Sequence, residues 1–284
     1  ADFRRFVASD ALPLGLRAKE KAEAETRKIK FMSNLSDIGF PVRHEGDVND
    51  VIMSVLGSVS EVRCPRGFYL KFSDKSGAEI YLQGNHDQEL IGFNPHFAGK
   101  SRRKVALTKA VEREASELDG GFHAWANPSD ENDPESGEYP FVFDLPDFRT
   151  VPNLDLPQTV EIQLTAFASN DFQMFADEKS YSDAQESELK YAAKSFVPTG
   201  LFAFDAENET VDLSLVRPVG KFAGEIKAFE LKTNSLTNEA FYWFLVETLG
   251  GEIDVVSDPK WLENEPNIGG IVRGQFWLSG RILS

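Results

Sequence analysis

The chain has 284 residues, of which 41% are hydrophobic and 27% charged, a composition typical of globular domains and unlike disordered, collagen-like or coiled-coil chains. Thirty basic against 46 acidic residues give a formal net charge of −16, the wrong sign for a general binder of duplex nucleic acid or anionic membranes. The single cysteine, Cys64, excludes a disulfide within the chain, and no apolar run reaches the roughly 18 to 20 residues that span a bilayer. We therefore expect a soluble, cytoplasmic protein.

Residues 1–31 differ in charge from the rest of the chain. They contain eight basic and five acidic residues, a net of +3. The stretch 16–30 is rich in strong helix formers but has few apolar positions, so a helix there would have little to bury. We expect residues 1–31 to form a basic helical arm or a leader.

Residues 32–150 have the pattern of an N-terminal α+β domain. Apolar residues recur at helical spacing from Val48 to Val59, directly after an acidic start at Asp47, which predicts an amphipathic helix. Short apolar or alternating runs predict strands at 67–72, 78–85, 89–93, 122–126 and 139–145. These strands predict a mostly antiparallel sheet.

The segment 101–121 has the pattern of a helix. Ser101 is a candidate N-cap, and the pair Gly120–Gly121 provides a stop. Six apolar residues between them define one helical face, namely Val105, Leu107, Ala110, Val111, Ala115 and Leu118. We therefore expect a helix in the middle of the N-terminal domain.

A proline-containing segment, 149–159, is the candidate linker to a C-terminal, β-rich domain over 151–284. After it we expect a hairpin formed by 160–168 and 171–176 and then an acidic helix over 177–195.

The last quarter of the chain, 219–284, has the element order strand, strand, strand, short helix, strand. Glycines inside its long strands, such as Gly224 and Gly274, are typical of bulges and barrel corners. This order resembles the OB-type barrel, in which a helix lies between the third and fourth strands. The resemblance implies a fifth strand, for which 210–216 is the candidate. The predicted fold is therefore α+β with two domains, an N-terminal α/β unit and a strand-rich unit that ends in a small OB-like barrel.

The last strand carries the sharpest pattern for a binding face. Alternation places Arg273, Gln275, Trp277 and Arg281 on the face that points away from the core. Because Trp and Arg dominate interfaces and also stack on bases and sugars, these four and Trp243 are our candidate ligand or partner face. In the alternative, Trp277 packs against the first domain and the arginines pair with acids such as Glu225, Glu252 or Asp254.

Strand 240–249 is apolar on both faces, so one face must meet another domain or a partner.

Three of the four histidines fall within 38 residues of one another, at His86, His96 and His123. Three imidazoles that converge could bind one metal ion, although loop histidines without a ligand are the commoner case. Cys64 follows Arg63, which could lower the pKa of its thiol, but no general base is indicated, and a small packing residue is the commoner role. No cofactor is expected, because the chain contains no phosphate-binding glycine motif and no recognised catalytic motif.

Negative charge is concentrated in one part of the chain. Residues 125–215 contain nineteen acidic and four basic residues, a net of −15. Such a segment attracts basic proteins and repels nucleic acid. Our first expectation is therefore a non-enzymatic interaction module that docks on a basic protein partner. The alternatives are an OB-like binder of single-stranded nucleic acid or oligosaccharide, and a hydrolase whose site is hidden by sequence order.

Overall fold

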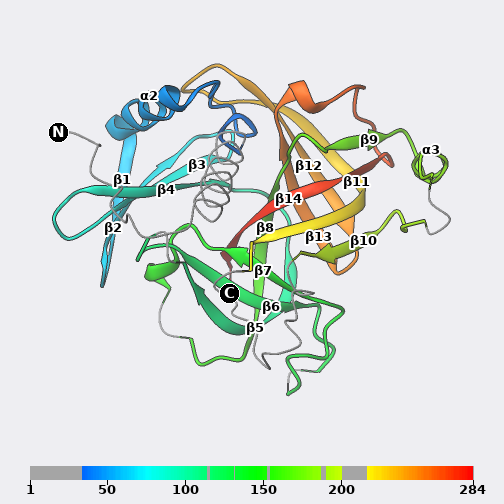
Figure 1. Cartoon of the computed structure of the whole chain (residues 1–284), viewed down its shortest axis with the longest axis horizontal. Helices are drawn as coiled ribbons and strands as arrows, with labels where there is room; N and C mark the ends of the chain where they lie inside the picture. The colour runs from blue at the N-terminus through cyan, green and yellow to red at the C-terminus, as the bar shows by residue number, and fades with distance from the viewer. Residues whose placement is uncertain are drawn as a thin grey trace, which may run out of the picture.

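The computed structural model describes residues 34–113, 116–130, 132–151, 154–186, 190–199 and 216–283. The protein is mostly β. A four-stranded sheet, sheet A, lies beside a ten-stranded sheet, sheet B, and eight strands of sheet B form a closed barrel (Figure 1). Among the described residues, no helix is long and apolar enough to cross a membrane.

Sheet A is an antiparallel meander with one helix beside it. Its strands are β1 (Val59–Cys64), β2 (Gly67–Ser73), β3 (Ala78–Gly84) and β4 (Leu90–Phe97), and they follow helix α2 (Glu45–Val55) and the 3₁₀ turn η1 (Leu56–Ser58). The carboxylate of Asp47 accepts the backbone N–H groups of Arg43 and His44 at 2.7 and 2.9 Å, which caps the start of α2. The three predicted strands are confirmed, and so is the helix up to Val55. The helix was expected to reach Val59, but Val59 begins β1, a strand that was not predicted.

Sheet B contains the remaining strands. These are β5 (Arg103–Glu112), β6 (Gly120–Ala126), β7 (Pro140–Asp144), β8 (Gln158–Phe167), β9 (Gln173–Phe175), β10 (Ser195–Pro198), β11 (Val219–Thr233), β12 (Ala240–Thr248), β13 (Gly251–Ser257) and β14 (Ile271–Ile282). Short helical turns interrupt the strands at η2 (Phe148–Thr150), α3 (Glu178–Asp183) and η4 (Pro259–Trp261).

The barrel closes because β13 pairs with β8 and β14 pairs with β7. Both pairings join strands from distant parts of the chain. The order around it is β11, β12, β13, β8, β5, β6, β7, β14 and back to β11. β8 also pairs directly with β14, from Leu278 opposite Ala166 to Ile282 opposite Ile162. The strand β8 therefore contacts β5, β13 and β14, and it ties the two halves of the chain together.

The helix predicted at 101–121 is wrong. The segment forms β5, a loop and the start of β6, and β5 pairs with β6 on one side and β8 on the other. Its apolar spacing also fits a strand, because a bulge between Leu107 and Lys109 shifts the alternation by one residue. Val105 and Leu107 face the barrel interior, so tertiary pairing outweighs the local helix propensity.

The division into two domains near residue 150 is not confirmed. β5, β6 and β7 precede the expected linker at 149–159, whereas β8 follows it, and all four belong to sheet B. The expected hairpin of 160–168 with 171–176 is wrong, because β9 pairs with β14 and not with β8. The expected helix over 177–195 is reduced to α3, Glu178–Asp183, in the described residues.

The block 219–284 does not close on itself. β11, β12, β13 and β14 are present as predicted, but β8 joins β13 to β14. The expected fifth strand at 210–216 lies outside the described residues, apart from Val216. The basic arm predicted for 1–31 also lies outside them.

Two apolar clusters hold these layers together. One fills the barrel, with Phe244 and Val246 of β12 pointing into it. The other lies outside the barrel and contains Phe241 and Trp243 from the opposite face of β12, packed with residues of α2 and sheet A. The prediction that both faces of this strand are covered is confirmed.

Candidate functional site

The two tryptophans of the predicted binding face are buried. Trp277 is 9% exposed, its ring centroid lies 5.0 Å from that of Phe167, and its Nε1 donates to Asp144 at 3.2 Å. Trp243 is 3% exposed, and its Nε1 donates to Asp254 Oδ1 at 2.7 Å. Neither ring offers an open face on which a base or sugar could stack.

The polar residues of that face lie at two ends of β14. Arg273 donates to Gln173 at 2.6 Å, and the backbone N–H of Gln275 donates to the carboxylate of Asp171. Arg281 lies eight residues after Arg273, a distance of about 26 Å along a strand. The five candidates therefore do not form one surface.

Two of the three acids expected to pair with these arginines, Glu225 and Asp254, have other partners. Glu225 pairs with Lys194 and Lys227 at 3.1 and 3.3 Å. Arg281 instead contacts Glu79 of sheet A, so β14 meets sheet A at this point.

The three histidines have separate environments. His86 is exposed beside the carbonyl of Pro65, His123 contacts the hydroxyl of Thr108 at 2.6 Å, and His96 is fully buried. In the described part of the chain, no group of three or more His, Cys, Asp or Glu side chains is placed to hold a metal ion. The structure therefore gives the metal hypothesis no support. Cys64 is a free, half-buried thiol at the end of β1.

The contact between sheet A and the barrel contains a buried polar network centred on Gln163 of β8. The amide nitrogen of Gln163 donates to Thr165 Oγ1 and to Asp254 Oδ2, at 2.8 Å each. Its Oε1 is therefore left to accept from His96 Nε2, at 3.1 Å. His96 Nδ1 then accepts from the hydroxyl of Ser279 at 2.8 Å, so the network determines the tautomer of the neutral imidazole.

Burial and charge hold this network in one protonation state. Desolvation and the nearby Arg281 charge lower the pKa of His96 from 6.5 to about 3, so the imidazole is neutral near pH 7. Burial alone would raise the pKa of Glu79, but the charges of Arg281 and Lys71 help to hold it below its usual value. Burial raises the pKa of the Tyr81 phenol and of the Asp147 carboxyl.

Asp254 shapes the loop that joins β4 to β5. Its carboxylate accepts the backbone N–H groups of Lys100 and Ser101 at 2.9 Å each, in addition to the bonds from Gln163 and Trp243. A Cβ at position 99 would overlap the Asp254 carboxyl group, so the backbone can approach this closely only because residue 99 is glycine. The buried acid therefore fixes the path of residues 99–102.

This loop forms one wall of a cavity of about 350 Å³. The cavity is lined by Lys100, Arg102 and Arg281, with Gln163 of the buried network and without any acidic residue. The other two cavities described, of about 390 and 310 Å³, both have carboxylates in their walls. We call the cavity of about 350 Å³ the cationic cavity.

The three cations are fixed in different ways. Lys100 Nζ lies 4.6 Å from the ring centroid of Trp243, and Arg102 NH1 donates to Glu161 at 2.6 Å. Arg281 uses NH2 for Glu79 and for the Tyr81 hydroxyl. Its Nε and NH1 have no hydrogen-bond partner among the described residues. The counter-ions Glu79 and Glu161 do not line the cavity, so its wall contains no carboxylate that would compete with a ligand for N–H donors.

Ser279 and His96 have the hydroxyl-to-imidazole contact of a nucleophile and its base. Both residues are 0% exposed, and neither lines the cationic cavity. A substrate has no access to this hydroxyl in the structure, so the pair supports the fold rather than catalysis.

Sequence reasoning found Arg281 and Trp243 but missed Lys100, Arg102 and Gln163. One signal was present: four of the five residues 100–104 are basic, in a strongly acidic chain. The prediction of a helix at 101–121 hid it, because charges on an exposed helix need no further explanation.

No protein-family model, no curated protein and no solved structure matches this chain.

Proposed function

We propose that this protein binds a small oxyanion, a carboxylate or a phosphate, in the cationic cavity. The observation that carries the proposal is the lining of that cavity, with three basic side chains and no acidic one, in a chain of net charge −16. An oxyanion is the chemical group that such a wall complements.

The surrounding contacts keep the cavity preorganised. Arg281 is held by Glu79 and Tyr81, and the loop that carries Lys100 is held by the Asp254 carboxylate. Because these groups are already ordered, binding loses less side-chain entropy than it would with free surface lysines.

The test is calorimetric titration of inorganic phosphate and of succinate into the wild type and into the double variant Lys100→Ala/Arg102→Ala. Hydrogen bonds to charged groups contribute about 1.5 to 3 kcal/mol each, so we expect the double variant to bind at least about tenfold more weakly. The matched control is Arg63→Ala/Lys179→Ala, which removes the same charge from two well-exposed positions outside the cavity. Absence of saturable binding to the wild type, or equal loss in both double variants, would overturn the proposal.

A second candidate function is docking on a basic protein partner, as the charge of residues 125–215 predicts. The loop between β6 and β7 favours it, because Asp130, Asp133, Glu135 and Glu138 occur there without any Lys or Arg between Trp125 and Tyr139. Asp130, Asp133, Glu135 and Glu138 are all exposed. We expect recovery of a basic partner that weakens with salt, since screening shortens the reach of such charges to about 8 Å at physiological ionic strength.

Pull-downs at low and high salt test this second function. They compare the wild type with Asp130→Asn/Asp133→Asn/Glu135→Gln. The matched control, Glu178→Gln/Asp183→Asn/Glu186→Gln, changes the charge equally on α3 and just after it. Recovery of the same proteins by both triple variants would remove the β6–β7 loop from consideration.

We also infer that the circuit β11, β12, β13, β8, β14 is an OB-type barrel in which the fifth strand comes first in the chain. The parallel pairing of β13 with β8 and the antiparallel pairing of β14 with both β8 and β11 support this. OB modules bind ligands on the face of their second and third strands. Here Phe241 and Trp243 on that face pack under sheet A and α2. Because this face is covered, binding of an oligonucleotide or oligosaccharide through Trp243 and Trp277 has less support than the oxyanion site.

A further inference from the structure

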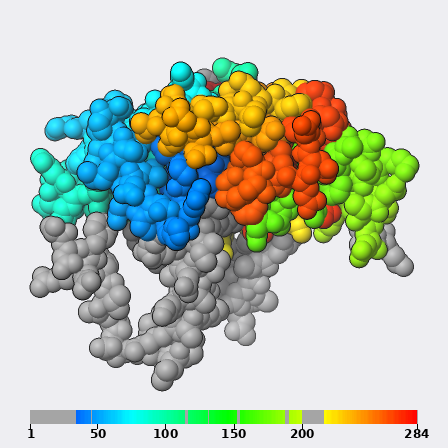
Figure 2. Space-filling view, turned by 90° about the horizontal axis from the view of Figure 1, so that it is seen from above, coloured from blue at the N-terminus to red at the C-terminus, as the bar shows by residue number. Residues whose placement is uncertain are grey.

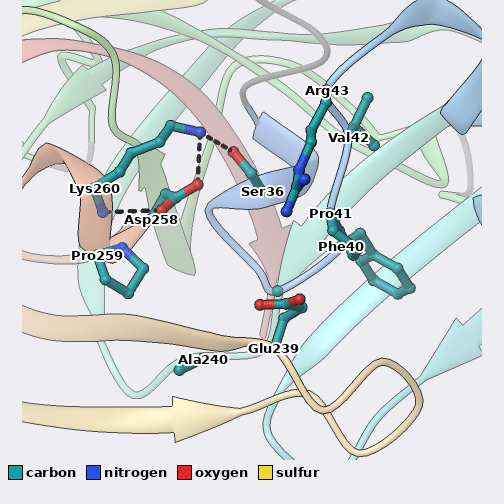
Figure 3. Close-up of a pocket in the computed structure, with 11 residues that line it drawn as sticks. Ser36, Phe40, Pro41, Val42, Arg43, Glu239, Ala240, Asp258, Pro259 and Lys260 are labelled. Carbon is teal, nitrogen blue, oxygen red and sulfur yellow. Dashed lines mark hydrogen bonds and ion pairs between the residues drawn. The ribbon is translucent and has the colours of Figure 1, made fainter.

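The cavity of about 390 Å³ shown in Figure 3 lies apart from the cationic cavity and has different walls. One wall comes from the segment before α2 and carries Ser36 and Arg43. The second is the turn between β11 and β12 with Glu239, and the third is formed by Asp258 and by η4 with Lys260. The segment before α2 and the η4 region also meet on the face of the molecule shown in Figure 2, where the blue and orange atoms adjoin.

Hydrogen bonds connect the first wall to each of the other two. Thr237 Oγ1 donates to the carbonyl of Gly39 at 2.5 Å, and Asn234 Nδ2 donates to the carbonyl of Ile38 at 3.1 Å. Gly39 has a φ of +78°, and a Cβ there would lie 2.8 Å from Asn234 Cβ, so glycine is required for this approach. The first and second walls are therefore held at a fixed separation.

The third wall is fastened to the first one. The backbone N–H of Asp258 donates to the fully buried carboxyl of Asp37 at 2.8 Å. Lys260 Nζ donates to Ser36 Oγ at 3.1 Å and to Asp258 Oδ2 at 2.6 Å. The cavity is thus preformed, and Lys260 and Asp258 neutralise each other within it.

Two opposite charges remain. The Arg43 guanidinium and the Glu239 carboxylate have no hydrogen-bond or ion-pair partner among the described residues, and both line the cavity. In Figure 3 they lie on opposite sides of it, the guanidinium above and the carboxylate below. Pro41, Ala240 and Pro259 add apolar surface to the walls of the cavity.

We propose that this pocket binds a free α-amino acid with an apolar side chain. The planar guanidinium of Arg43 matches the α-carboxylate, and the carboxylate of Glu239 matches the α-ammonium group. The apolar side chain then covers the proline and alanine surface. A cavity of this size lies within the usual range of small-molecule sites.

The experiment is calorimetric titration of L-leucine, L-valine and L-phenylalanine into the full chain. Two leucine derivatives serve as matched ligand controls: N-acetyl-L-leucine lacks the ammonium group, and L-leucinamide lacks the carboxylate. We expect saturable binding of at least one amino acid. For leucine, we expect each derivative to bind at least about tenfold more weakly than the parent.

Two variants assign the two ends of the ligand. Glu239→Gln should abolish the preference for leucine over N-acetyl-L-leucine and keep the preference over L-leucinamide, whereas Arg43→Gln should do the reverse. Both side chains are exposed, so we expect unchanged melting temperatures, and Glu263→Gln is the control on the neighbouring loop. Failure of all three amino acids to bind, or leucine binding insensitive to both derivatives, overturns the proposal. Neither result depends on the outcome of the phosphate titration.

Discussion

The two faces of β3 are buried in different ways, one by apolar packing and the other by polar contacts. All seven residues of β3 are buried. One face presents Ala78, Ile80 and Leu82 to the apolar cluster that includes α2. The other presents Glu79, Tyr81 and Gln83, whose partners come from β2, the β5–β6 loop and β14. Alternation of polar and apolar residues usually marks a half-exposed strand, but here the polar face is an internal interface.

The two faces differ in what they require of their neighbours. The apolar face gains from contact area in any direction, whereas each donor and acceptor on the polar face needs a partner at a defined position. Apolar packing therefore holds sheet A on the barrel, and the polar network determines how sheet A is oriented there.

The largest effect is expected on the apolar side. Trp277→Ala removes a buried ring from the cluster shared by sheet A and the barrel, and removal of a core aromatic costs about 3 to 5 kcal/mol. Urea denaturation measures the change in the free energy of unfolding. Trp277→Phe keeps most of the ring and is the control. A loss below about 1 kcal/mol in the alanine variant would contradict the packing role.

The next effect tests the polar side through the Glu79–Arg281 pair. Glu79→Gln leaves Arg281 and Lys71 without their carboxylate, and breaking a buried pair costs about 3 to 5 kcal/mol. Arg281 keeps 31% of its side chain exposed, so we expect a smaller loss, about 2 to 3 kcal/mol. In a double-mutant cycle with Arg281→Met, a coupling energy near zero would show that the pair is not a unit.

A pH effect of about 2 kcal/mol is expected from His96. Its folded-state pKa of about 3 lies below the ordinary 6.5, so between these values the unfolded state binds the additional proton. The contribution of the neutral His96 to the free energy of unfolding is fully present above pH 6.5. It decreases as the pH falls, by about 2 kcal/mol between pH 6.5 and 5. Asp119 and Asp147, whose pKa values burial raises, act in the opposite direction.

Comparison of the wild type with His96→Gln isolates this contribution. Chemical denaturation at pH 7, 6 and 5 should show a shallower slope in the variant, which is less stable at pH 7 but loses less on acidification. His123→Gln is the control, because that imidazole is only half buried. Equal slopes in the wild type and His96→Gln would show that this imidazole does not remain neutral.

The smallest effect lies at the rim of the interface. Arg102 pairs with Glu161, but 65% of its side chain is exposed, and such pairs contribute little to stability. Arg102→Gln should therefore change the free energy of unfolding by less than about 0.5 kcal/mol. A larger loss would mean that the polar interface extends to the surface.

Local pattern was sufficient for elements whose apolar spacing allowed one interpretation. The helix around Val48–Val55, three of the four strands of sheet A and the strands of 240–282 are close to their predicted positions, whereas β1 was not predicted. At 101–121 the spacing allowed both a helix and a bulged strand, and pairing with β8 decided between them. The pairing of β9 with β14 likewise depends on contacts about 100 residues apart in the chain.

For the candidate sites, the chain by itself determined the residue types but not their surroundings. Arg281 and Trp243 were singled out as parts of one ligand or partner face, yet Arg281 binds Glu79 of sheet A and Trp243 lies under Lys100. The alternation of β12 predicted a strand with two apolar faces, and both faces are covered in the structure. Tertiary structure alone decided which face meets which partner, because the hydrogen bonds and charges that select a register join residues far apart in the chain.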